Sequence, residues 1–469
     1  MKKIFIAVVV IFSLPLGKGG DGLFAQQWHK LGTGVAYAGV SVECLKEING
    51  DLYVGGGFAT QYGAKGNGIA KYNSSTEVWD SVGCGLGEVL SIESYNGEIY
   101  AGGSFAYYLQ PPTCNNWPPD SSSAGLAKWN GSYWGPVDTA MWGSSPDMGI
   151  IYAINFKNDL YMGGSLFSGS YMNMARYNGS TWDNMLGGIG GFGVLAMTVY
   201  KGDLIVAGSF TQAGLGGGNW MSANYIARWD GVKWDSLGSN GVNNQISSLT
   251  IDTVNDVLYA GGIFTMAGGI PAKQVAKWDG IQWSALPPLP AWSLANVHAL
   301  KMFKGKLYAS VTAFPSDTAL LCFDGINWQI IYGPRETITA MEVYNGNLYV
   351  GGSFDKIDTT VVNCIACYGD SCPGTPITVT IGVNNLQTKS LKFKVYPNPA
   401  KGEINIEAEG KETKNYITRI YNSVGVKIVE QKFVKQTKIS TSDFSKGIYQ
   451  VQVCDKDGKI CYTEKIVLD

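Results

Sequence analysis

Histidine is the scarcest residue that could carry out chemistry in this chain. Among 469 residues there are only 2 histidines, His29 and His298. A Ser-His-Asp hydrolase needs a positioned histidine as its base, and the chain has no Gly-x-Ser-x-Gly elbow to present a nucleophile. We therefore interpret His298 as a packed or channel-lining residue. We expect no catalytic histidine, no metal site and no cofactor.

The 9 cysteines favour disulfides over metal binding. Cys364 and Cys367 form a Cys-x-x-Cys pair, but no second pair and no histidine stands at zinc spacing. Because Cys372 is nearby, a local disulfide is the preferred interpretation. Cys454 and Cys461 flank an Asp-Gly turn and would face each other across a hairpin, which would allow a second disulfide. An odd number leaves at least one cysteine unpaired.

Two glycine-containing motifs resemble ligand-binding loops, but the residues around them do not support that function. Residues 188–193 fit Gly-x-Gly-x-x-Gly, but they precede a predicted strand and open no helix, so nucleotide binding is not indicated. Asp455 to Gly458 resembles the start of a calcium loop, but Lys459 and Ile466 stand where ligands are needed. The net charge is −2, which provides no basic face for nucleic acid.

The N-terminus has the pattern of an export signal. Lys2 and Lys3 precede the apolar run Ile4 to Leu16, and the small residue Ala25 follows. The apolar run is too short to span a bilayer but suits a signal peptide, so residues 1–25 are predicted to be removed. No other run approaches the length of a membrane span, so we expect no transmembrane segment in the mature chain.

A repeat of turn, Leu-Tyr, Gly-Gly and Phe indicates how the middle of the chain is organised. Seven copies centre on Tyr53, Tyr100, Tyr161, Ile205, Tyr259, Tyr308 and Tyr349. An aliphatic residue precedes each copy: Val42, Val89, Ile150, Val194, Ile246, Val297 and Ile338. A third phrase ending in an aromatic residue and a fourth containing tryptophan follow. Each repeat therefore predicts four short strands, and seven such units predict a β-propeller of seven blades.

The last repeat lacks its own tryptophan. It ends at Tyr368, whereas Trp28 to Gly32 at the mature N-terminus matches the fourth-strand phrase of the other repeats. We therefore expect Trp28 to supply the fourth strand of the last blade, which closes the ring by joining its two ends. The repeated Trp and Tyr side chains are expected to pack one blade against the next.

These repeats resemble kelch-like propellers, most closely those of fungal cortical cell-polarity markers. The resemblance lies in the Leu-Tyr-x-Gly-Gly-x-Phe phrase and in Ala-x-Trp-Asp-Gly-x-x-Trp, and it extends from about Trp28 to Tyr368. It implies the propeller fold. Propellers serve many functions, so it implies little about activity.

The end of the chain has a different character. Residues 373–390 carry no repeat and are predicted to be a linker after a propeller of residues 26–372. Residues 391–469 alternate like strands and suit a small immunoglobulin-like β-sandwich. Four phrases resemble the C-terminal sorting domain of type IX secretion substrates: Val395 to Pro399, Tyr421 to Gly425, Asp443 to Val451, and Lys465 to Leu468. The resemblance implies delivery by the type IX machinery to the cell surface or the medium.

The propeller topology predicts where a partner would bind. Short turns gather on one face, while the longer connections from the second strand to the third, and from blade to blade, share the other. Four tryptophans lie outside the repeat columns, and all four fall on those longer connections: Trp117, Trp142, Trp220 and Trp292. Tyr107 and Tyr108 lie in the same connection as Trp117. Such side chains stack on sugars or grip peptides, although they also cover neighbouring loops.

The sequence therefore predicts an exported binding or adhesion module for glycan or extracellular protein, and not an enzyme. One alternative is a carbohydrate-active enzyme that uses paired carboxylates on the loop side of the ring. Another is a structural component of the surface layer without a discrete ligand.

Overall fold

The protein is described by a computed structural model that covers most of the chain. The described residues are 26–35, 40–58, 68–104, 125–137, 150–168, 171–214, 221–238, 240–289, 295–313, 317–377, 379, 392–409, 415–421, 427–455 and 460–468. They form antiparallel strands and one short 3-10 turn, η2 (Met185–Gly187), with no α-helix in these stretches. The chain divides into two compact units, Met1–Thr380 and Ile381–Asp469.

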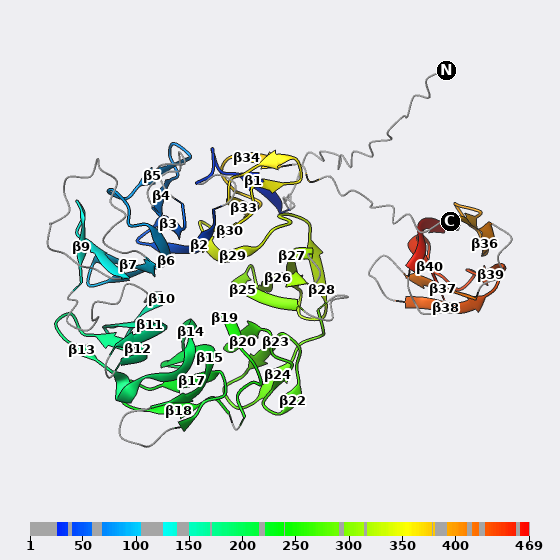
Figure 1. The fold of residues 1–469 in the computed structure, drawn as a ribbon. Coiled ribbons are helices and arrows are strands. Elements are labelled where there is room, and N and C mark those ends of the chain that lie inside the picture. The colour runs from blue at the N-terminus through cyan, green and yellow to red at the C-terminus, as the bar shows by residue number, and fades with distance from the viewer. Residues whose placement is uncertain are drawn as a thin grey trace. The chain divides into compact units, whose positions relative to one another are not determined.

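Within its described residues, the first unit contains seven larger sheets built on one plan (Figure 1). We number the sheets 1 to 7 by the order of their innermost strands along the chain. The innermost strands are β2 (Val42–Ile48), β6 (Glu88–Tyr95), β10 (Ile150–Phe156), β14 (Ile189–Tyr200), β19 (Ile246–Asp252), β25 (Ala295–Phe303) and β29 (Ile338–Tyr344). The second strands are β3 (Asp51–Gly56), β7 (Glu98–Ser104), β11 (Asp159–Ser168), β15 (Asp203–Ala213), β20 (Val257–Gly262), β26 (Lys306–Ala313) and β30 (Asn347–Gly352).

The third and fourth strands complete each sheet towards its outer edge. The third strands are β4 (Ile69–Asn73), β8 (Leu126–Trp129), β12 (Tyr171–Tyr177), β17 (Ile226–Trp229), β23 (Val275–Trp278), β27 (Asp317–Phe323) and β33 (Ile365–Gly369). The fourth strands are β5 (Val78–Ser81), β9 (Trp134–Pro136), β13 (Trp182–Asp183), β18 (Trp234–Ser236), β24 (Trp283–Ala285), β28 (Trp328–Ile331) and β1 (Gln27–Lys30). The short strands β16 (Met221–Ser222), β21 (Met266–Ala267), β22 (Ile270–Pro271), β31 (Lys356–Ile357) and β32 (Thr360–Val361) lie outside this plan.

Two-residue turns join the first and second strands in six of the seven sheets, as the sequence predicts, whereas residues 253–256 join β19 to β20 in sheet 5. At Asn49-Gly50 both residues have positive φ, 53° and 83°, and Asn96-Gly97 repeats the pattern with 51° and 79°. These values fit the type I′ turn, which matches the twist of antiparallel strands and favours Asn followed by Gly. The connections between the second and third strands vary more in length, from residues 169–170 between β11 and β12 to residues 105–125 between β7 and β8.

The ring closes in the way the N-terminal tryptophan predicts. Each innermost strand contacts the innermost strands of both neighbouring sheets, and β29 of sheet 7 contacts β2 of sheet 1. Strand β1 pairs with β33 and places Trp28 opposite Tyr368. The first and last sheets of the chain are therefore neighbours, and the two ends of the first unit share one sheet.

One detail of this closure differs from the prediction. Thr375–Ile377 lies in the stretch expected to be a linker, but it forms strand β34 and pairs with the free edge of β1. The order in sheet 7 is therefore β29-β30-β33-β1-β34. An unpaired strand edge leaves backbone donors and acceptors open, and β34 satisfies those of β1. The short Thr-Pro-Ile sequence carries too little pattern to reveal this pairing.

The two glycines of the repeat lie where neighbouring strands approach closely. A Cβ atom on Gly56 would lie 2.1 Å from the carbonyl oxygen of Ser41, so a larger residue would push the first two strands apart. A Cβ atom on Gly55 would lie 2.7 Å from Val89 Cγ1 in the next sheet. In sheet 6 a serine replaces this glycine, and the Ser310 hydroxyl donates to the Ile338 carbonyl at 2.7 Å.

The aromatic residues of the third and fourth strands form one pair in every sheet. Their ring centroids lie 4.7 to 5.5 Å apart. The pairs are Tyr72–Trp79, Trp129–Trp134, Tyr177–Trp182, Trp229–Trp234, Trp278–Trp283, Phe323–Trp328 and Tyr368–Trp28. Several tryptophans also reach the preceding sheet: Trp234 Nε1 donates to the Met185 carbonyl at 2.7 Å, and Trp134 Nε1 to that of Val82 at 2.9 Å. These side chains pack sheet against sheet.

The second unit contains two antiparallel sheets around one core. Buried residues of both sheets meet in this core, among them Ile404 and Ile406 from one sheet and Val451 and Ile466 from the other. One sheet has the order β35 (Lys392–Tyr396), β36 (Glu403–Glu409), β39 (Gln436–Ser440). The other has the order β38 (Lys427–Phe433), β37 (Tyr416–Tyr421), β40 (Gly447–Asp455), β41 (Ile460–Leu468).

The second disulfide that the sequence allowed is not formed. Cys454 is a free, buried cysteine, and its thiol contacts Arg419 Nη1 at 3.7 Å. A register shift lies between Val453 and Cys454 and pairs Cys454 with Ile460. The backbone of Cys461 therefore does not stand directly opposite Cys454, as the simple hairpin assumed.

Candidate functional site

The six aromatic residues expected to bind a ligand lie outside the described residues. They are Tyr107, Tyr108, Trp117, Trp142, Trp220 and Trp292. Their role stays a prediction. The described parts of the chain contain a different candidate site, which is formed by the innermost strands.

Every innermost strand carries a β-bulge at the same point. The register shifts by one residue just after the aliphatic residue of the repeat, so one extra residue has no partner on the second strand. The extra residues are Glu43, Leu90, Ile151, Leu195, Ser247, His298 and Thr339. Bulges bend a strand and redirect side chains, and they are common beside binding sites. The sequence showed the aliphatic residue but not the bulge after it.

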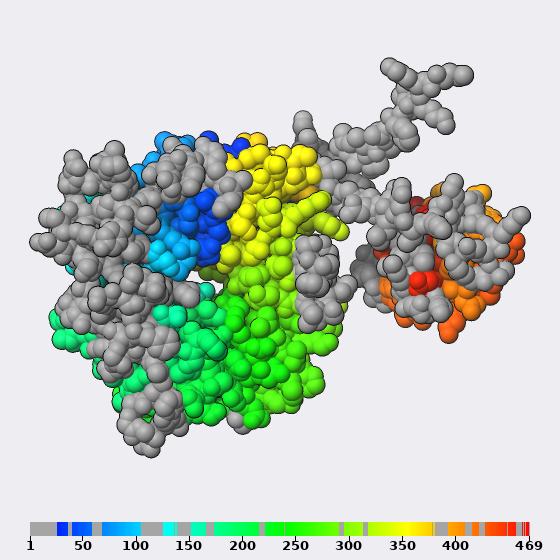
Figure 2. Space-filling model, in the orientation of Figure 1, coloured from blue at the N-terminus to red at the C-terminus, as the bar shows by residue number. Residues whose placement is uncertain are grey.

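The innermost strands enclose a cavity of about 360 Å³, which we call the axial cavity. All seven innermost strands line it, and Figure 2 shows a small hollow where the sheets meet at the centre of the first unit. Each of these strands begins at a connection from the preceding sheet and ends at the short turn that leads to its second strand. The bulge residues therefore lie near the end that carries the longer connections, which we call the loop face. The opposite end is the turn face.

Two ion pairs occupy the part of the cavity towards the turn face. Lys46 of sheet 1 pairs with Glu93 of sheet 2 at 2.7 Å, and Lys301 of sheet 6 pairs with Glu342 of sheet 7 at 2.7 Å. Each pair joins neighbouring sheets, and all four residues stand four positions after the aliphatic residue of their repeat. These charges are therefore matched within the wall itself.

Hydroxyl groups of the wall also connect neighbouring sheets. Ser91 Oγ accepts a hydrogen bond from the Ala153 backbone at 2.9 Å, and Ser248 Oγ accepts one from that of Leu300 at 2.9 Å. The Thr339 hydroxyl donates to the Val42 carbonyl. These three polar side chains are used in holding the ring together.

Glu43, Cys44 and Tyr152 also line the axial cavity, and the Cys44 thiol donates to the Val89 carbonyl at 3.9 Å. Burial, followed by the neighbouring Glu43 carboxylate, raises the pKa of the Cys44 thiol, so Cys44 is not a thiolate nucleophile. Burial raises the pKa of Tyr152 to about 12, with further contributions from Cys44 and Glu43. Tyr152 therefore keeps its proton at neutral pH. Tyr152 belongs to sheet 3 and Glu43 belongs to sheet 1.

His298 lines the axial cavity, in agreement with its interpretation as a channel-lining residue. Its Nε2 lies 3.1 Å from Thr312 Oγ1, and burial lowers its pKa. His298 is therefore mainly neutral at neutral pH.

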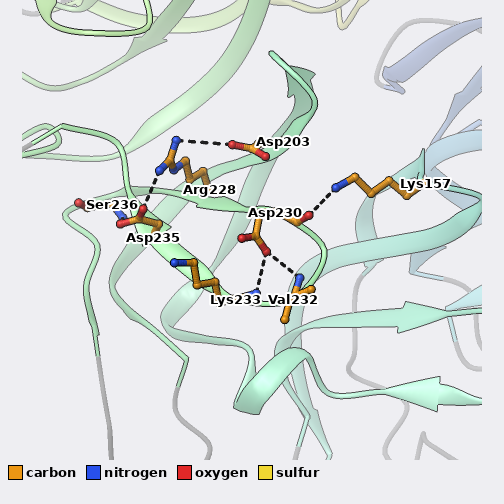
Figure 3. A network of polar contacts seen from close by, with 8 residues as sticks. All are labelled: Lys157, Asp203, Arg228, Asp230, Val232, Lys233, Asp235 and Ser236. Atoms are coloured by element: carbon orange, nitrogen blue, oxygen red, sulfur yellow. Dashed lines mark hydrogen bonds and ion pairs between the residues drawn. The ribbon is translucent and has the colours of Figure 1, made fainter.

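The turn face is fixed by lysines that reach from one sheet to the next. Lys157 Nζ of sheet 3 donates to the Asp230 carbonyl of sheet 4 at 2.5 Å, and Lys201 Nζ of sheet 4 donates to the Asp279 carbonyl of sheet 5 at 3.1 Å. The Asp230 side chain accepts from the backbones of Val232 and Lys233 and so shapes its own turn (Figure 3).

Arg228 forms a second network at the outer strands of sheet 4. It lies 2.6 Å from Asp235 and 3.5 Å from Asp203, so it bridges the second, third and fourth strands (Figure 3). Lys71, Lys128 and Arg176 occupy the same repeat position in sheets 1 to 3 and form equivalent ion pairs. A feature repeated in four sheets indicates a structural role.

The local disulfide expected from the cysteine spacing is confirmed. It joins Cys367 to Cys372, with the Cα atoms 5.9 Å apart. Among the residues that the structure describes, no group of three His, Cys, Asp or Glu side chains is placed to hold a metal ion.

Comparison with known proteins identifies the second unit. Residues 394–469 match the family model of the secretion system C-terminal sorting domain, as the type IX resemblance implied. The protein is therefore exported and is secreted or attached to the outer surface. No helix in the described residues is long and apolar enough to cross a membrane. No curated protein matches the chain.

Solved structures give only distant likenesses to the chain. The extracellular domain of a putative one-component system from B. thetaiotaomicron has a TM-score of 0.45 at 12% identity, and the match covers 95% of this chain and 59% of that one. Sqt1 of Saccharomyces cerevisiae has a TM-score of 0.39 at 9% identity, with 74% and 99% covered. The chain thus spans about three-fifths of the length of the first of these.

Proposed function

We propose that the first unit is a seven-bladed β-propeller that acts at the cell surface or in the medium as a binding or adhesion module. Its partner is a glycan or an extracellular protein. The type IX sorting domain supports the location. Seven sheets of four or five strands whose innermost strands touch in cyclic order support the propeller.

The difference between the two faces of the ring carries the binding proposal. The turn face consists of short hairpins tied together by Lys157, Lys201 and their carbonyl partners. The loop face holds the longer connections and the polar bulge residues Glu43 and His298. Rigid frameworks commonly place recognition residues on such variable loops.

Phe192 adds a described aromatic residue to the loop face. It lies at the start of β14, between Gly191 and Gly193, and 88% of its surface is exposed. Both glycines have positive φ, 136° and 139°, so this segment leaves the regular strand path. Exposed aromatic rings of this kind suit stacking on sugar or contact with a peptide. In the sequence, Phe192 stands between two glycines within residues 188–193, the stretch that fits Gly-x-Gly-x-x-Gly.

We propose binding without turnover, because glycoside cleavage uses two carboxyl groups in one cleft. Of the three glutamates that line the axial cavity, Glu93 and Glu342 are engaged with lysines. Glu43 alone does not supply the pair.

The test is a binding screen of the mature chain, residues 26–469, against glycans and extracellular proteins. Phe192→Ala and the double variant Trp117→Ala/Trp220→Ala should each weaken a saturable interaction, because each removes aromatic contact area from the loop face. Tyr133→Ala is the matched control, since Tyr133 is 44% exposed on a turn-face hairpin.

Binding that persists in both loop-face variants but disappears in Tyr133→Ala would place the partner on the wrong face and contradict the proposal. A ligand that is cleaved during long incubation would favour the carbohydrate-active enzyme instead.

A further inference from the structure

One carboxylate in the axial cavity, that of Glu43, has no partner among the described residues. Glu43 forms no ion pair and its side chain accepts no hydrogen bond among the described residues, whereas Glu93 and Glu342 each bind a lysine at 2.7 Å. The cavity wall thus contains three glutamates and two lysines, together with His298, which burial keeps mainly neutral at neutral pH. The wall therefore carries one unmatched negative charge, and that charge belongs to a half-buried side chain near the loop face.

Tyr152 provides the second element of a site. It lines the same cavity from sheet 3, and its hydroxyl forms no hydrogen bond with any described residue. The Glu43 carboxylate is one of the groups that raise the pKa of Tyr152, so the two side chains are electrostatic neighbours across the ring. A carboxylate beside an aromatic ring is a suitable environment for a cation, because the ring face is also negative.

The rest of the wall divides into two halves. The charged residues come from sheets 6, 7, 1 and 2, which are consecutive in the ring. Sheets 3, 4 and 5 contribute uncharged residues to the described lining, both apolar ones such as Met197 and Leu249 and hydroxyl-bearing ones such as Thr198 and Thr250. A ligand would therefore meet a carboxylate on one side and an uncharged wall, with apolar and hydroxyl groups, on the other.

We propose that the axial cavity binds an organic ammonium ion on an apolar stem, with the Glu43 carboxylate as its counter-ion and Tyr152 beside it. An anion would face the unmatched charge of Glu43. A metal ion requires several oxygen or nitrogen ligands, whereas an ammonium group can be satisfied by one carboxylate, a hydroxyl and backbone carbonyls. A volume of about 360 Å³ accommodates an alkyl stem of lysine size.

Two sources can supply this chemistry: a free small amine, or a lysine side chain of an extracellular protein inserted from the loop face. The second source rests on the proposed binding function, whereas the first does not.

The experiment compares two ligands that differ by the terminal ammonium group, by calorimetric titration of the mature chain. Nα-acetyl-lysine methylamide carries the ammonium group, and Nα-acetyl-norleucine methylamide keeps the stem without it. We expect the lysine derivative to bind about ten- to a hundredfold more tightly, the usual range for a charge-assisted hydrogen bond. Equal affinities, or no saturable binding of either ligand, would overturn the inference without any mutation.

Variants then locate the interaction. Glu43→Gln preserves the shape of the side chain and should abolish the preference for the charged ligand. Glu88→Gln is the matched control, because Glu88 is an exposed carboxylate near the loop-face end of β6 that does not line the cavity. Tyr152→Leu should lower the affinity for both ligands several-fold, because it removes the aromatic side chain. An unchanged preference in Glu43→Gln, in a chain whose near-UV circular dichroism is native, would also overturn the inference.

Two further titrations distinguish the sources and separate this inference from the proposed function. Cadaverine tests a free amine, and a lysine-containing peptide alongside its acetylated form tests a protein side chain. If the cavity binds ammonium ligands but the screen of glycans and proteins finds no partner, the proposed adhesion function is contradicted and this inference stands. If the screen finds a partner but the cavity shows no preference for ammonium ligands, this inference is contradicted and the proposed function stands.

Discussion

The outer strands of the ring repeat, whereas the wall of the axial cavity varies. An aromatic pair joins the third and fourth strands of all seven sheets, and several of its tryptophans donate a hydrogen bond to the preceding sheet. The bulge position of the innermost strands holds Glu, Leu, Ile, Leu, Ser, His and Thr in turn. Both regions come from the same repeat and occupy equivalent places in every sheet.

This difference separates what builds the ring from what the ring can recognise. The outer aromatic position has the same packing environment in all seven sheets, so the same kind of residue is needed each time. A bulge residue has no partner on the second strand, so its type is free to differ between sheets.

Loss of the closing strand should have the largest effect. Deleting residues 26–31 removes β1, exposes the edges of β33 and β34, and takes Trp28 from its place against Tyr368. We expect a loss of more than the ~3–5 kcal/mol typical of removing one buried tryptophan. Urea unfolding followed by tryptophan fluorescence reports this, because the last tryptophan is Trp328 and the second unit contains none. An unchanged midpoint would show that the ring does not depend on its N-terminal strand.

A single outer tryptophan should be nearly as important. Trp234→Ala removes a buried ring and its hydrogen bond to Met185, so we expect ~3–5 kcal/mol of destabilisation. Trp234→Phe keeps most of the packing and should cost ~1–2 kcal/mol, chiefly by leaving the Met185 carbonyl unpaired. Equal effects of the two substitutions in urea unfolding would contradict a role for the hydrogen bond.

Glycines that support these tryptophans should be less costly to replace. Gly83 has a φ of 60°, and a Cβ atom there would lie 2.5 Å from Trp129 Cζ3, so Gly83→Ala should cost ~2–3 kcal/mol. Gly97→Ala, in a turn with no atom near the added Cβ, should cost only the ~1 kcal/mol of its backbone conformation. Similar thermal shifts for both variants would argue against the close contact with Trp129.

The surface ion pairs should contribute little. Arg228 lowers the pKa of Asp235 below its ordinary value of 3.8. The pair therefore stabilises the native state above that pH, and its contribution is lost as the pH falls further through the native pKa. Both side chains are more than two-fifths exposed, so Asp235→Asn should cost only ~0.5 kcal/mol at pH 7 and less at pH 3. A larger loss at pH 3 than at pH 7 would contradict this sign.

The axial wall should show the smallest effect on stability. Glu43 forms no ion pair or hydrogen bond with the described residues, so Glu43→Gln should change the free energy of unfolding by no more than ~0.5 kcal/mol. Urea unfolding of this variant beside Trp234→Ala gives the contrast directly. A strongly destabilised Glu43→Gln chain would mean that the wall, like the outer strands, is part of the structural framework.

The sequence predicts the repeated part of the fold because each repeated contact leaves a repeated residue. The missing seventh tryptophan and the phrase at Trp28 together predict how the ring closes, and the paired glycines predict close strands. The bulge after the aliphatic residue leaves no such trace, since its residue type changes from Glu43 to Leu90 and beyond. Glu43 and Tyr152 stand in different repeats, so only the closed ring brings them together.

The most direct test of this account is peptide-level hydrogen exchange on the mature chain with and without Nα-acetyl-lysine methylamide. The account predicts added protection in the innermost strands β2 and β10, which carry Glu43 and Tyr152, and none in the outer strands β9 and β18. Protection confined to the outer strands or to the sorting domain would contradict it.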